Sequence, residues 1–349
     1  MSKFGVNQQL IADRLNLSRT TVSRCFTNHP GINPETRSRV FKLATSLGYS
    51  YQEGRTGKKS ERKKLSTLGV LICTDPESYA DEDYENPGAR LLAGVSEFAQ
   101  LNQAQLDIHL VSPGERSLDA ASYRGITPLH NREWDGVLLI YPFPESVIDE
   151  LQKLYPVVSL IEQFANTPLN SVDANHHRGI ELVIQHLADL GHERIGFLTH
   201  GYDVSAKWAL RRYSAFVAET ERLGLEIQSE DIITPVIADR LSADEVHQLA
   251  LDRTRKGVTA WVCAADHQGY QFYAFLRDQG LSVPGDVSIT GFDGIAPPEW
   301  APPLTTIKIP YHEIGLTGGK RLHDLVQKRF EFSQDILIDC VLLPGMTTK

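Results

Sequence analysis

The feature that most constrains the fold is the alternation of short, β-rich apolar runs with amphipathic segments from Leu68 onward. Seven runs are predicted as buried strands, at residues 68–73, 106–111, 136–141, 156–161, 194–200, 259–264 and 286–293. Stretches of helical period lie between them, at 89–101, 179–190, 213–223 and 271–279. Alternating strands and helices predict parallel sheets covered by crossover helices. Because the pattern extends over roughly 280 residues, it predicts two α/β subdomains rather than one.

An all-α unit is predicted ahead of this pattern. Apolar residues at helical spacing predict a first helix over residues 7–15, and Ser18 stands at the N-cap of a second. Asn33-Pro34-Glu35 begins a third helix, because it combines a capping side chain, a proline at the first helical position and an early acid. Two helices joined by a tight turn and supported by a third form a helix-turn-helix unit.

The charges of the chain are separated by sign. Residues 1–64 hold 13 of the 35 lysines and arginines but only 4 of the 44 aspartates and glutamates, so a head of net charge +9 precedes a body of net charge −18. A basic head on an acidic body indicates a nucleic-acid-binding head. A merely solvated basic tail is the alternative, but such a tail would not need apolar residues at helical spacing.

The second helix carries the side chains that would read DNA, because a helix-turn-helix inserts this helix into the major groove N-terminus first. Arg19 and Thr20 lie on its first turn and Arg24 lies further along its outward face, where arginine can donate two hydrogen bonds to guanine and threonine can contact a base. The hydroxyl donors Ser18, Thr21 and Ser23 suit phosphate oxygens. Alternatively, Thr21 and Ser23 are ordinary helix residues and Arg24 contacts a phosphate.

This segment resembles a known family. "IADRLNLSRTTVSRCF", followed by "INPETRSRVFKLATSLGYS", looks like the headpiece of the lactose/galactose-repressor (LacI/GalR) family, whose pattern is I-A-x-x-x-x-V-S-x-x-T-V-S-R, then V-S-x-x-T-R-x-R-V, then L-G-Y. The resemblance implies that Arg19, Thr20 and Arg24 are the principal base-reading residues. It adds Thr27 and Asn28 to the DNA contacts, although Thr27 stands where the family usually has asparagine.

The segment after the headpiece departs from the family pattern. Residues 52–64, "QEGRTGKKSERKK", are polar and basic, which is typical of a flexible linker. In the resembling family this segment forms a hinge helix on DNA, and a leucine from it enters the minor groove. Gly57 or Lys58 occupies that position here, and the glycines of the segment oppose helix. Arg55, Lys58 and Lys59 are therefore predicted to contact phosphates or to enter a narrow minor groove; a disordered tether is the alternative.

Four blocks of the body are similar to the effector domain of the same family, in order and at the expected spacing: "LADLGHERIGFLTH", "VTAWVCAADHQGY", "GLSVPGDVSITGFD" and "PPLTTIKIPYHEIG". The resemblance implies a periplasmic-binding-protein type I fold, with two Rossmann-like lobes joined by three crossing strands near Asn166, Pro298 and Phe332. The expected divisions are a helix-turn-helix domain (1–50), a hinge or linker (51–66) and an effector-binding and dimerisation domain (67–349), with one lobe at 67–165 and 299–331 and the other at 167–297 and 333–349.

An effector is expected between the two lobes, outside the carboxyl ends of the strands. A sugar needs carboxylates and amides to accept from its hydroxyls, an arginine to donate and an aromatic face to stack on. Asp293 ends a predicted strand, and Arg212 begins "RYSAF", which is similar to the family's effector-binding R-x-x-G-[YFW] with Ala215 in place of glycine. The other effector-binding candidates are Tyr84, Asn86, Asp173, Asn175, Trp208 and Asp266.

Three of these candidates have structural alternatives: Asp266 as a helix cap, Asp173 as a turn residue and Trp208 as packing. Ala265 stands where the family commonly has a ligand-contacting asparagine, which argues against a common hexose pose. A purine or a phosphorylated sugar as effector, and activation in place of repression, therefore remain alternatives.

No enzyme chemistry is predicted. The sequence contains no G-x-x-x-x-G-K-[ST], G-x-S-x-G or H-E-x-x-H motif, and neither a cofactor nor a metal is expected. The cysteines are scattered, at Cys25, Cys73, Cys263 and Cys340, as in a reduced cytoplasmic protein. No signal-peptide pattern and no apolar run long enough for a membrane span is present, so we expect a location in the bacterial cytoplasm, associated with the nucleoid.

These observations predict a ligand-responsive repressor of carbohydrate-utilisation genes. It would bind a pseudo-palindromic double-stranded DNA operator as a homodimer, because one headpiece reads one half-site. A small-molecule effector, expected to be a sugar, would modulate operator affinity. A transport receptor would lack the basic headpiece, and an enzyme fused to a DNA-binding domain would contain a catalytic constellation.

Overall fold

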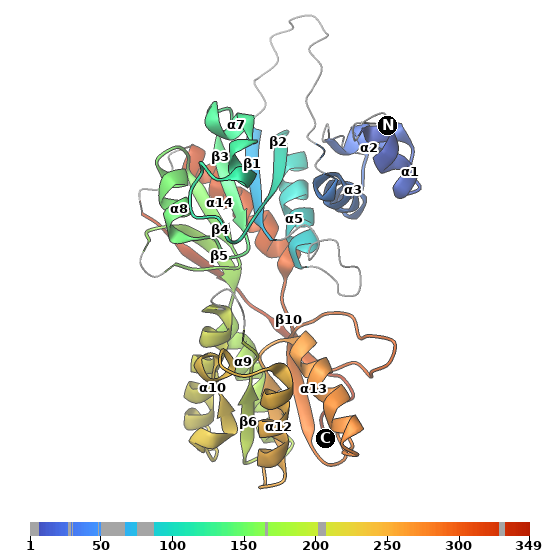
Figure 1. Cartoon of the computed structure of the whole chain (residues 1–349), viewed down its shortest axis with the longest axis vertical. Helices are drawn as coiled ribbons and strands as arrows, with labels where there is room; N and C mark the ends of the chain where they lie inside the picture. The colour runs from blue at the N-terminus through green and yellow to red at the C-terminus, as the bar shows by residue number, and fades with distance from the viewer. Residues whose placement is uncertain are drawn as a thin grey trace, which may run out of the picture. The chain divides into compact units, whose positions relative to one another are not determined.

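The computed structural model describes residues 7–26, 29, 31–47, 49, 67–74, 87–164, 167–201, 207–327 and 332–349. These residues form two compact units (Figure 1). The first unit contains the N-terminal helices and the strand β1 (Thr67–Cys73), continues to Asp173 and includes Tyr311–Leu337; the second contains Ala174–Pro310 and Ile338–Lys349. The predicted fold class, a helix-turn-helix headpiece followed by an α/β body, is confirmed.

The headpiece consists of α1 (Gln8–Arg14), α2 (Arg19–Phe26) and α3 (Pro34–Ser46). Asn7, Ser18 and Asn33 each accept a hydrogen bond from a backbone amide of the following helix, at 2.7–3.0 Å. These caps satisfy amides that have no partner within the helix, as the sequence predicts. The core between the helices is apolar and buried, and it contains Ile11, Ala12, Val22, Cys25, Val40, Phe41 and Ala44.

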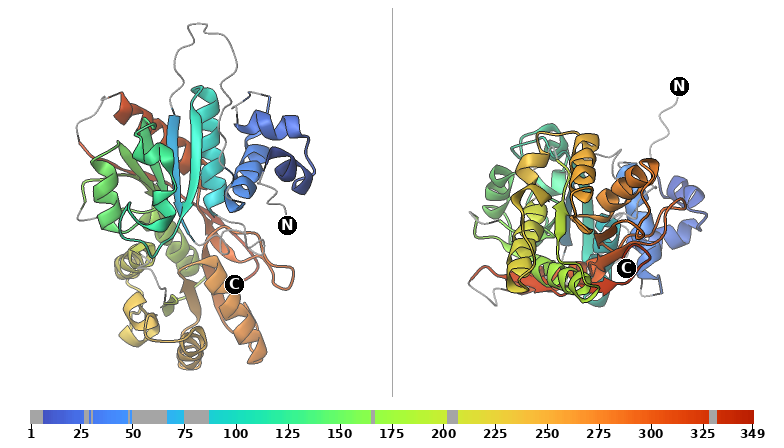
Figure 2. Two further views of the ribbon diagram at one scale, coloured as in Figure 1. Left: turned by 45° about the horizontal axis from the view of Figure 1, so that its top comes forward. Right: turned by 90° about the horizontal axis from the view of Figure 1, so that it is seen from below.

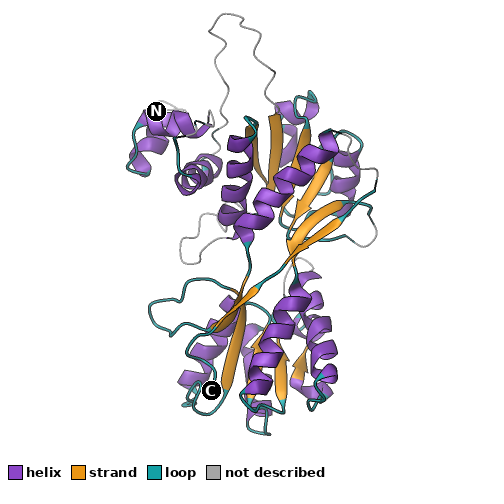
Figure 3. Cartoon of the chain, turned by 180° about the vertical axis from the view of Figure 1, so that it is seen from behind, coloured by secondary structure: helices purple, strands orange, loops and turns teal. Residues whose placement is uncertain are grey.

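Within its described residues, the first unit is built on a six-stranded sheet in the order β11-β5-β4-β3-β1-β2. The strands besides β1 are β2 (Gln105–Val111), β3 (Gly136–Ile140), β4 (Val157–Leu160), β5 (Asn170–Ala174) and β11 (Asp335–Ile338). The helices are α5 (Pro87–Leu101), α6 (Ala121–Arg124), α7 (Thr127–His130), α8 (Glu145–Gln152) and α14 (Tyr311–Val326). β1 to β5 pair in parallel, and helices cover the sheet (Figure 3).

The second unit repeats this architecture, again with six strands in its described part, in the order β12-β10-β9-β8-β6-β7. The strands are β6 (Ile195–Leu198), β7 (Ile232–Ile233), β8 (Ala260–Cys263), β9 (Ser288–Asp293), β10 (Thr305–Lys308) and β12 (Val341–Leu343). The helices are α9 (His176–Asp189), α10 (Lys207–Arg222), α11 (Pro235–Ala238), α12 (Ala243–Thr254) and α13 (Asp266–Asp278). β12 pairs antiparallel with β10, whereas β6 to β10 pair in parallel.

The chain passes between the units at Asp173–Ala174, Pro310–Tyr311 and Leu337–Ile338. These points lie C-terminal to the crossings expected near Asn166, Pro298 and Phe332. Asn166 lies outside the described residues. Pro298 belongs to a proline-rich loop between β9 and β10, both of which remain in the second unit, so its turn residues mark a loop and not a crossing.

Helices α5 and α14 of the first unit approach each other backbone to backbone. A Cβ added at Gly94 would lie 1.9 Å from the His312 carbonyl oxygen, and one at Gly315 would lie 2.0 Å from that of Leu91. Glycine is therefore required at both positions, and the two helices form one rigid layer on the sheet. None of the described helices combines the length and the apolar character that a membrane span requires.

Candidate DNA-binding surface and effector site

The outward face of α2 presents the predicted DNA-reading residues. Ser18, Arg19, Thr20 and Arg24 are exposed, whereas Val22 of the same helix is fully buried. The Ser18 and Thr21 hydroxyls lie 2.8 Å apart, and Ser18 Oγ also accepts from the Thr21 amide. The Ser18 and Thr21 hydroxyls thus take part in the N-cap of α2. Arg19, Thr20 and Arg24 face outward. Ser23 is half-buried.

Arg37 of α3 is a buried arginine that the sequence alone does not distinguish from its neighbours. Its side chain is fully buried, and its guanidinium donates to the carbonyl oxygens of Cys25 at 2.8 Å and His29 at 3.0 Å. These carbonyls lie at and beyond the end of α2, where helix carbonyls lack intrahelical partners. Arg37 therefore fixes the recognition helix to α3. The motif T-R-x-R-V contained the signal, but nothing in it distinguishes the buried arginine from the exposed Arg39.

Seven of the predicted site residues lie outside the described residues. They are Thr27, Asn28, Arg55, Lys58 and Lys59 of the DNA-contacting set and Tyr84 and Asn86 of the effector set.

In the second unit, Arg212 of α10 is the centre of a buried polar cluster. It is 3% exposed, and its guanidinium donates to His176 Nδ1 at 3.2 Å, to the Ala264 carbonyl and to Asp293 Oδ1 at 3.1 Å. The guanidinium also contacts two aromatic rings, with Cζ 4.5 Å from the centroid of Trp208 and 3.9 Å from that of Phe292. Cation–π stacking and the ion pair hold its position and orientation. The structure thus brings together the predicted Trp208, Arg212 and Asp293.

Asp293 is the last residue of β9 and has an unusual backbone. Its φ of +130° lies where non-glycine residues are rarely found. Such strain tends to occur at functional sites, and the carboxyl end of a parallel strand is where ligands bind in these sheets. Its side chain is 16% exposed. Asp293 therefore pairs with Arg212 and still reaches the surface of its unit.

Asp266 was predicted to contact the effector, but the structure places it in the interior of the second unit. It is fully buried; its Oδ1 accepts from the Thr306 hydroxyl, and its Oδ2 accepts from the Ile295 amide at 2.9 Å. Burial, and secondarily the charge of Asp293, raise the pKa of Asp266 to about 7. Because both oxygens are bonded inside the unit, Asp266 braces the loop after β9 against β10 and does not present a free carboxylate to an effector.

Asp173 and Asn175 likewise make structural contacts. Asp173 is fully buried and accepts from Gln163 Nε2 at 3.0 Å. Asn175 caps α9 by accepting from the Arg178 amide at 3.1 Å, and its Nδ2 donates to Asp339 at 2.9 Å. Asp173 was offered as a turn residue, but it lies within β5, and its buried contact with Gln163 is one inside the first unit. His176, which touches Arg212, was missed because a histidine at the start of an amphipathic segment carries no signal of burial.

A pair of buried histidines lies elsewhere in the second unit. His200 Nε2 and His247 Nε2 are 3.0 Å apart, and His247 stacks on Phe272. Burial lowers the pKa of both imidazoles to about 4. Across the described residues no group of three or more histidine, cysteine or acidic side chains is placed to hold a metal ion.

This pair predicts acid sensitivity. The unfolded chain takes up protons below the ordinary histidine pKa of 6.5, whereas the folded chain resists them until about pH 4, so the free energy of unfolding falls as the pH is lowered through that window. His247→Gln removes one of the two groups that take up a proton on unfolding. The pH dependence of the free energy of unfolding should therefore decrease by about one proton, as measured by urea unfolding at a series of pH values. The exposed His130→Gln is the matched control. Equal slopes for His247→Gln and the parent protein would contradict the assignment.

Two family models match the chain. The model for "Bacterial regulatory proteins, lacI family" matches residues 9–52, and the model for "Periplasmic binding protein-like domain" matches residues 184–348. The first match covers the headpiece, and the second covers most of the second unit and α14.

Curated relatives span nearly the whole chain. The HTH-type transcriptional repressor CytR of Escherichia coli (strain K12) is 28% identical over 97% of this chain and 95% of its own. The ribose operon repressor of Haemophilus influenzae is 24% identical over 95% of this chain and 96% of its own.

Solved structures share the fold. The lac repressor dimer bound to operator and the anti-inducer ONPF has a TM-score of 0.63 at 23% identity, and the transcriptional regulator CelR in complex with cellobiose has a TM-score of 0.64 at 20% identity. Each alignment covers 98% of this chain and 99% of the other.

Proposed function

Since the chain belongs to the lacI family of bacterial regulatory proteins, we propose that it represses carbohydrate-utilisation genes and that a sugar effector modulates its affinity for operator DNA. It acts as a cytoplasmic homodimer on a pseudo-palindromic operator, because each helix-turn-helix reads one half-site. Two of the relatives are repressors, one of them of a ribose operon, and the CelR structure is a complex with cellobiose. These relatives support repression and a sugar effector.

The observation that carries the DNA-binding role is the exposed face of α2. Arg19, Thr20 and Arg24 project from a helix whose opposite side is buried in the headpiece core. A rigid helix that presents two arginines and a threonine can make base contacts in the major groove. The effector role rests on the Arg212–Asp293 pair, which offers donors and acceptors beside the Trp208 ring at the carboxyl end of β9.

The effector proposal is tested by thermal unfolding of the purified protein against mono- and disaccharides, sugar phosphates and purines. A ligand at 100 times its Kd stabilises the native state by about 2.7 kcal/mol, which shifts the melting temperature clearly. A neutral sugar that raises the melting temperature, and also changes operator affinity, supports the proposal. A response to purines or phosphorylated compounds alone would replace the sugar by one of those classes.

Arg19→Ala is expected to relax base preference at one position of each half-site. The loss of a bidentate arginine contact weakens binding to the preferred base by about 1–3 kcal/mol and leaves other sequences nearly unaffected. The operator is first selected from random duplex DNA with the parent protein, and the selection is repeated with the variant. Arg14→Ala, an exposed arginine at the end of α1, should retain the base preference. An unaltered preference in Arg19→Ala would remove that residue from the base-reading set.

A further inference from the structure

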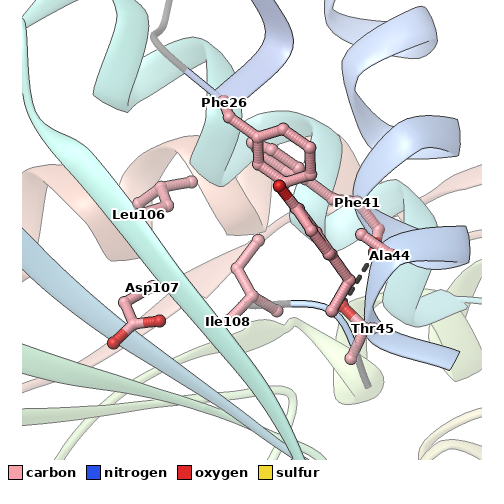
Figure 4. Close-up of a pocket in the computed structure, with 8 residues that line it drawn as sticks. Phe26, Phe41, Ala44, Thr45, Leu106, Asp107 and Ile108 are labelled. Carbon is pink, nitrogen blue, oxygen red and sulfur yellow. Dashed lines mark hydrogen bonds between the residues drawn. The ribbon is translucent and has the colours of Figure 1, made fainter. Parts of the chain in front are cut away.

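A small cavity in the first unit has no room for a ligand. Phe26, Phe41, Leu106 and Ile108 are among the residues that line it (Figure 4), and its volume is about 20 Å³. Such a space holds roughly one water molecule. The buried polar cluster around Arg212 in the second unit offers more to a ligand, because it combines donors, acceptors and aromatic rings.

Three segments of the second unit hold the Arg212 guanidinium, one at each of its nitrogens. Nε donates to His176 Nδ1 of α9 at 3.2 Å, and Nη2 donates to Asp293 Oδ1 of β9 at 3.1 Å. Nη1 donates to the carbonyl oxygen of Ala264, which follows β8. These bonds use three of the five N–H groups of a guanidinium, and the other two are the donors that an effector would meet.

The fold itself fixes the position of His176. It is the first residue of α9, directly after the N-cap Asn175, and it is only 6% exposed. Helix α9 packs against α10, the helix that carries Arg212 (Figure 2). The His176 and Phe292 ring centroids are 5.8 Å apart, and Arg212 Cζ lies 3.9 Å from the centroid of the same Phe292 ring. Phe292 therefore supports both the imidazole and the guanidinium.

The bond from Arg212 Nε to His176 Nδ1 defines which imidazole nitrogen carries the proton. A guanidinium contains donors and no acceptor, so Nδ1 must be the acceptor of this bond and carries no proton. The proton of the neutral imidazole is then on Nε2. A proton on Nδ1 would set one N–H against another and would break the bond.

We propose that His176 is a positioning residue of the effector site: its Nδ1 accepts the Arg212 Nε–H and thereby sets the plane of the guanidinium that binds the effector. This inference rests on the proposed function, because it concerns the residue through which Arg212 is oriented toward the effector. Nε joins the guanidinium to the rest of the side chain, so a fixed Nε–H limits rotation of the whole group. Without this acceptor, the two N–H groups left for the effector lose their fixed direction.

The ring nitrogens of His176 test the proposal without any effector. The full chain is labelled with nitrogen-15 histidine, and the ring signals are recorded by NMR at neutral pH. The signals that disappear in His176→Asn belong to His176, and their nitrogen shifts distinguish a protonated from an unprotonated ring nitrogen. We expect a neutral ring with its proton on Nε2 alone. A proton on Nδ1 would overturn the proposal.

Two substitutions separate the acceptor from the ring. His176→Phe keeps a ring beside Phe292 but removes the acceptor, whereas His176→Asn places an amide oxygen near the position of Nδ1. Effector affinity is measured from melting shifts at rising ligand concentration. D-ribose and cellobiose are the first probes, followed by the other compounds of the melting experiment. His177→Phe is the matched control, because His177 is the next residue of α9 and pairs with Glu219 at 3.1 Å.

His176→Phe is expected to weaken binding of the compound that stabilises the parent protein by about 10- to 100-fold, the size of one hydrogen bond to a charged group. His176→Asn should recover most of this affinity, and His177→Phe should retain it. Unchanged affinity in His176→Phe would refute the positioning role. An equal loss in His176→Phe and His176→Asn would refute it as well, because ring packing would then be the cause. If no compound stabilises the parent protein, the proposed effector function fails instead, and the His176 ring nitrogens still decide the present proposal.

Discussion

Arg37→Met is expected to abolish operator binding while the second unit stays folded. The variant keeps an apolar side chain of similar length but removes the donors to the Cys25 and His29 carbonyl oxygens. Loss of the donor to the buried Cys25 carbonyl destabilises by about 1–3 kcal/mol, whereas the His29 carbonyl still accepts from the Ile32 amide at 3.2 Å. A headpiece of about fifty residues has a total stability of only about 3–7 kcal/mol. The loss is therefore a large part of the headpiece's stability, and α2 loses the side chain that fixes it to α3.

The measurement combines operator affinity with amide hydrogen exchange. Exchange should accelerate throughout α1, α2 and α3 and remain slow in β8 and β9 of the second unit. Arg39→Met is the control, because Arg39 is exposed on the same helix two residues away. Slow headpiece exchange in Arg37→Met, with normal operator affinity, would show that the buried arginine is dispensable.

Several of the strands that the sequence predicts have continuous apolar runs, although β2 was predicted from a mixed run and is half-buried. β1, β3 and β8 are buried over all or nearly all of their length, so burial on both faces produces an uninterrupted signal. β11 and β12 were missed because they alternate exposed and half-buried positions and depend on partners far away in the sequence. Helix α14 was missed because glycines replace apolar residues where it meets α5.

The candidate effector site likewise contains residues that the sequence predicts and one whose role depends on contacts far away in the sequence. Arg212 and Asp293 were predicted separately, from a motif and from a strand end, and the structure places them 3.1 Å apart. Asp266 was predicted from its position after a strand, but its role depends on Thr306, forty residues later. Local sequence therefore identifies which side chains stand at strand ends, whereas the fold decides which of them remain available.

Arg212→Met is expected to destabilise the second unit by about 3–5 kcal/mol and to eliminate the response to effector. The variant leaves the Asp293 carboxylate without its charged partner in a largely buried position, and removing one member of a buried pair has a cost of that size. It also takes away the donor to the Ala264 carbonyl. Urea unfolding measures the first effect, and ligand-induced melting shifts measure the second. Arg211→Met, at the half-buried neighbour, is the control. It should change the free energy of unfolding by no more than about 1 kcal/mol and should keep the ligand-induced melting shift.

Combining Arg212→Met with Asp293→Asn separates folding from binding. The double variant no longer buries an unpaired charge, so a large part of the lost stability should return, and a double-mutant cycle measures the coupling between the two residues. The ligand response should stay absent, because the donor and the carboxylate that would contact the effector are both gone. If the double variant recovers stability and also responds to the sugar, the Arg212–Asp293 pair is a structural ion pair and the effector binds elsewhere.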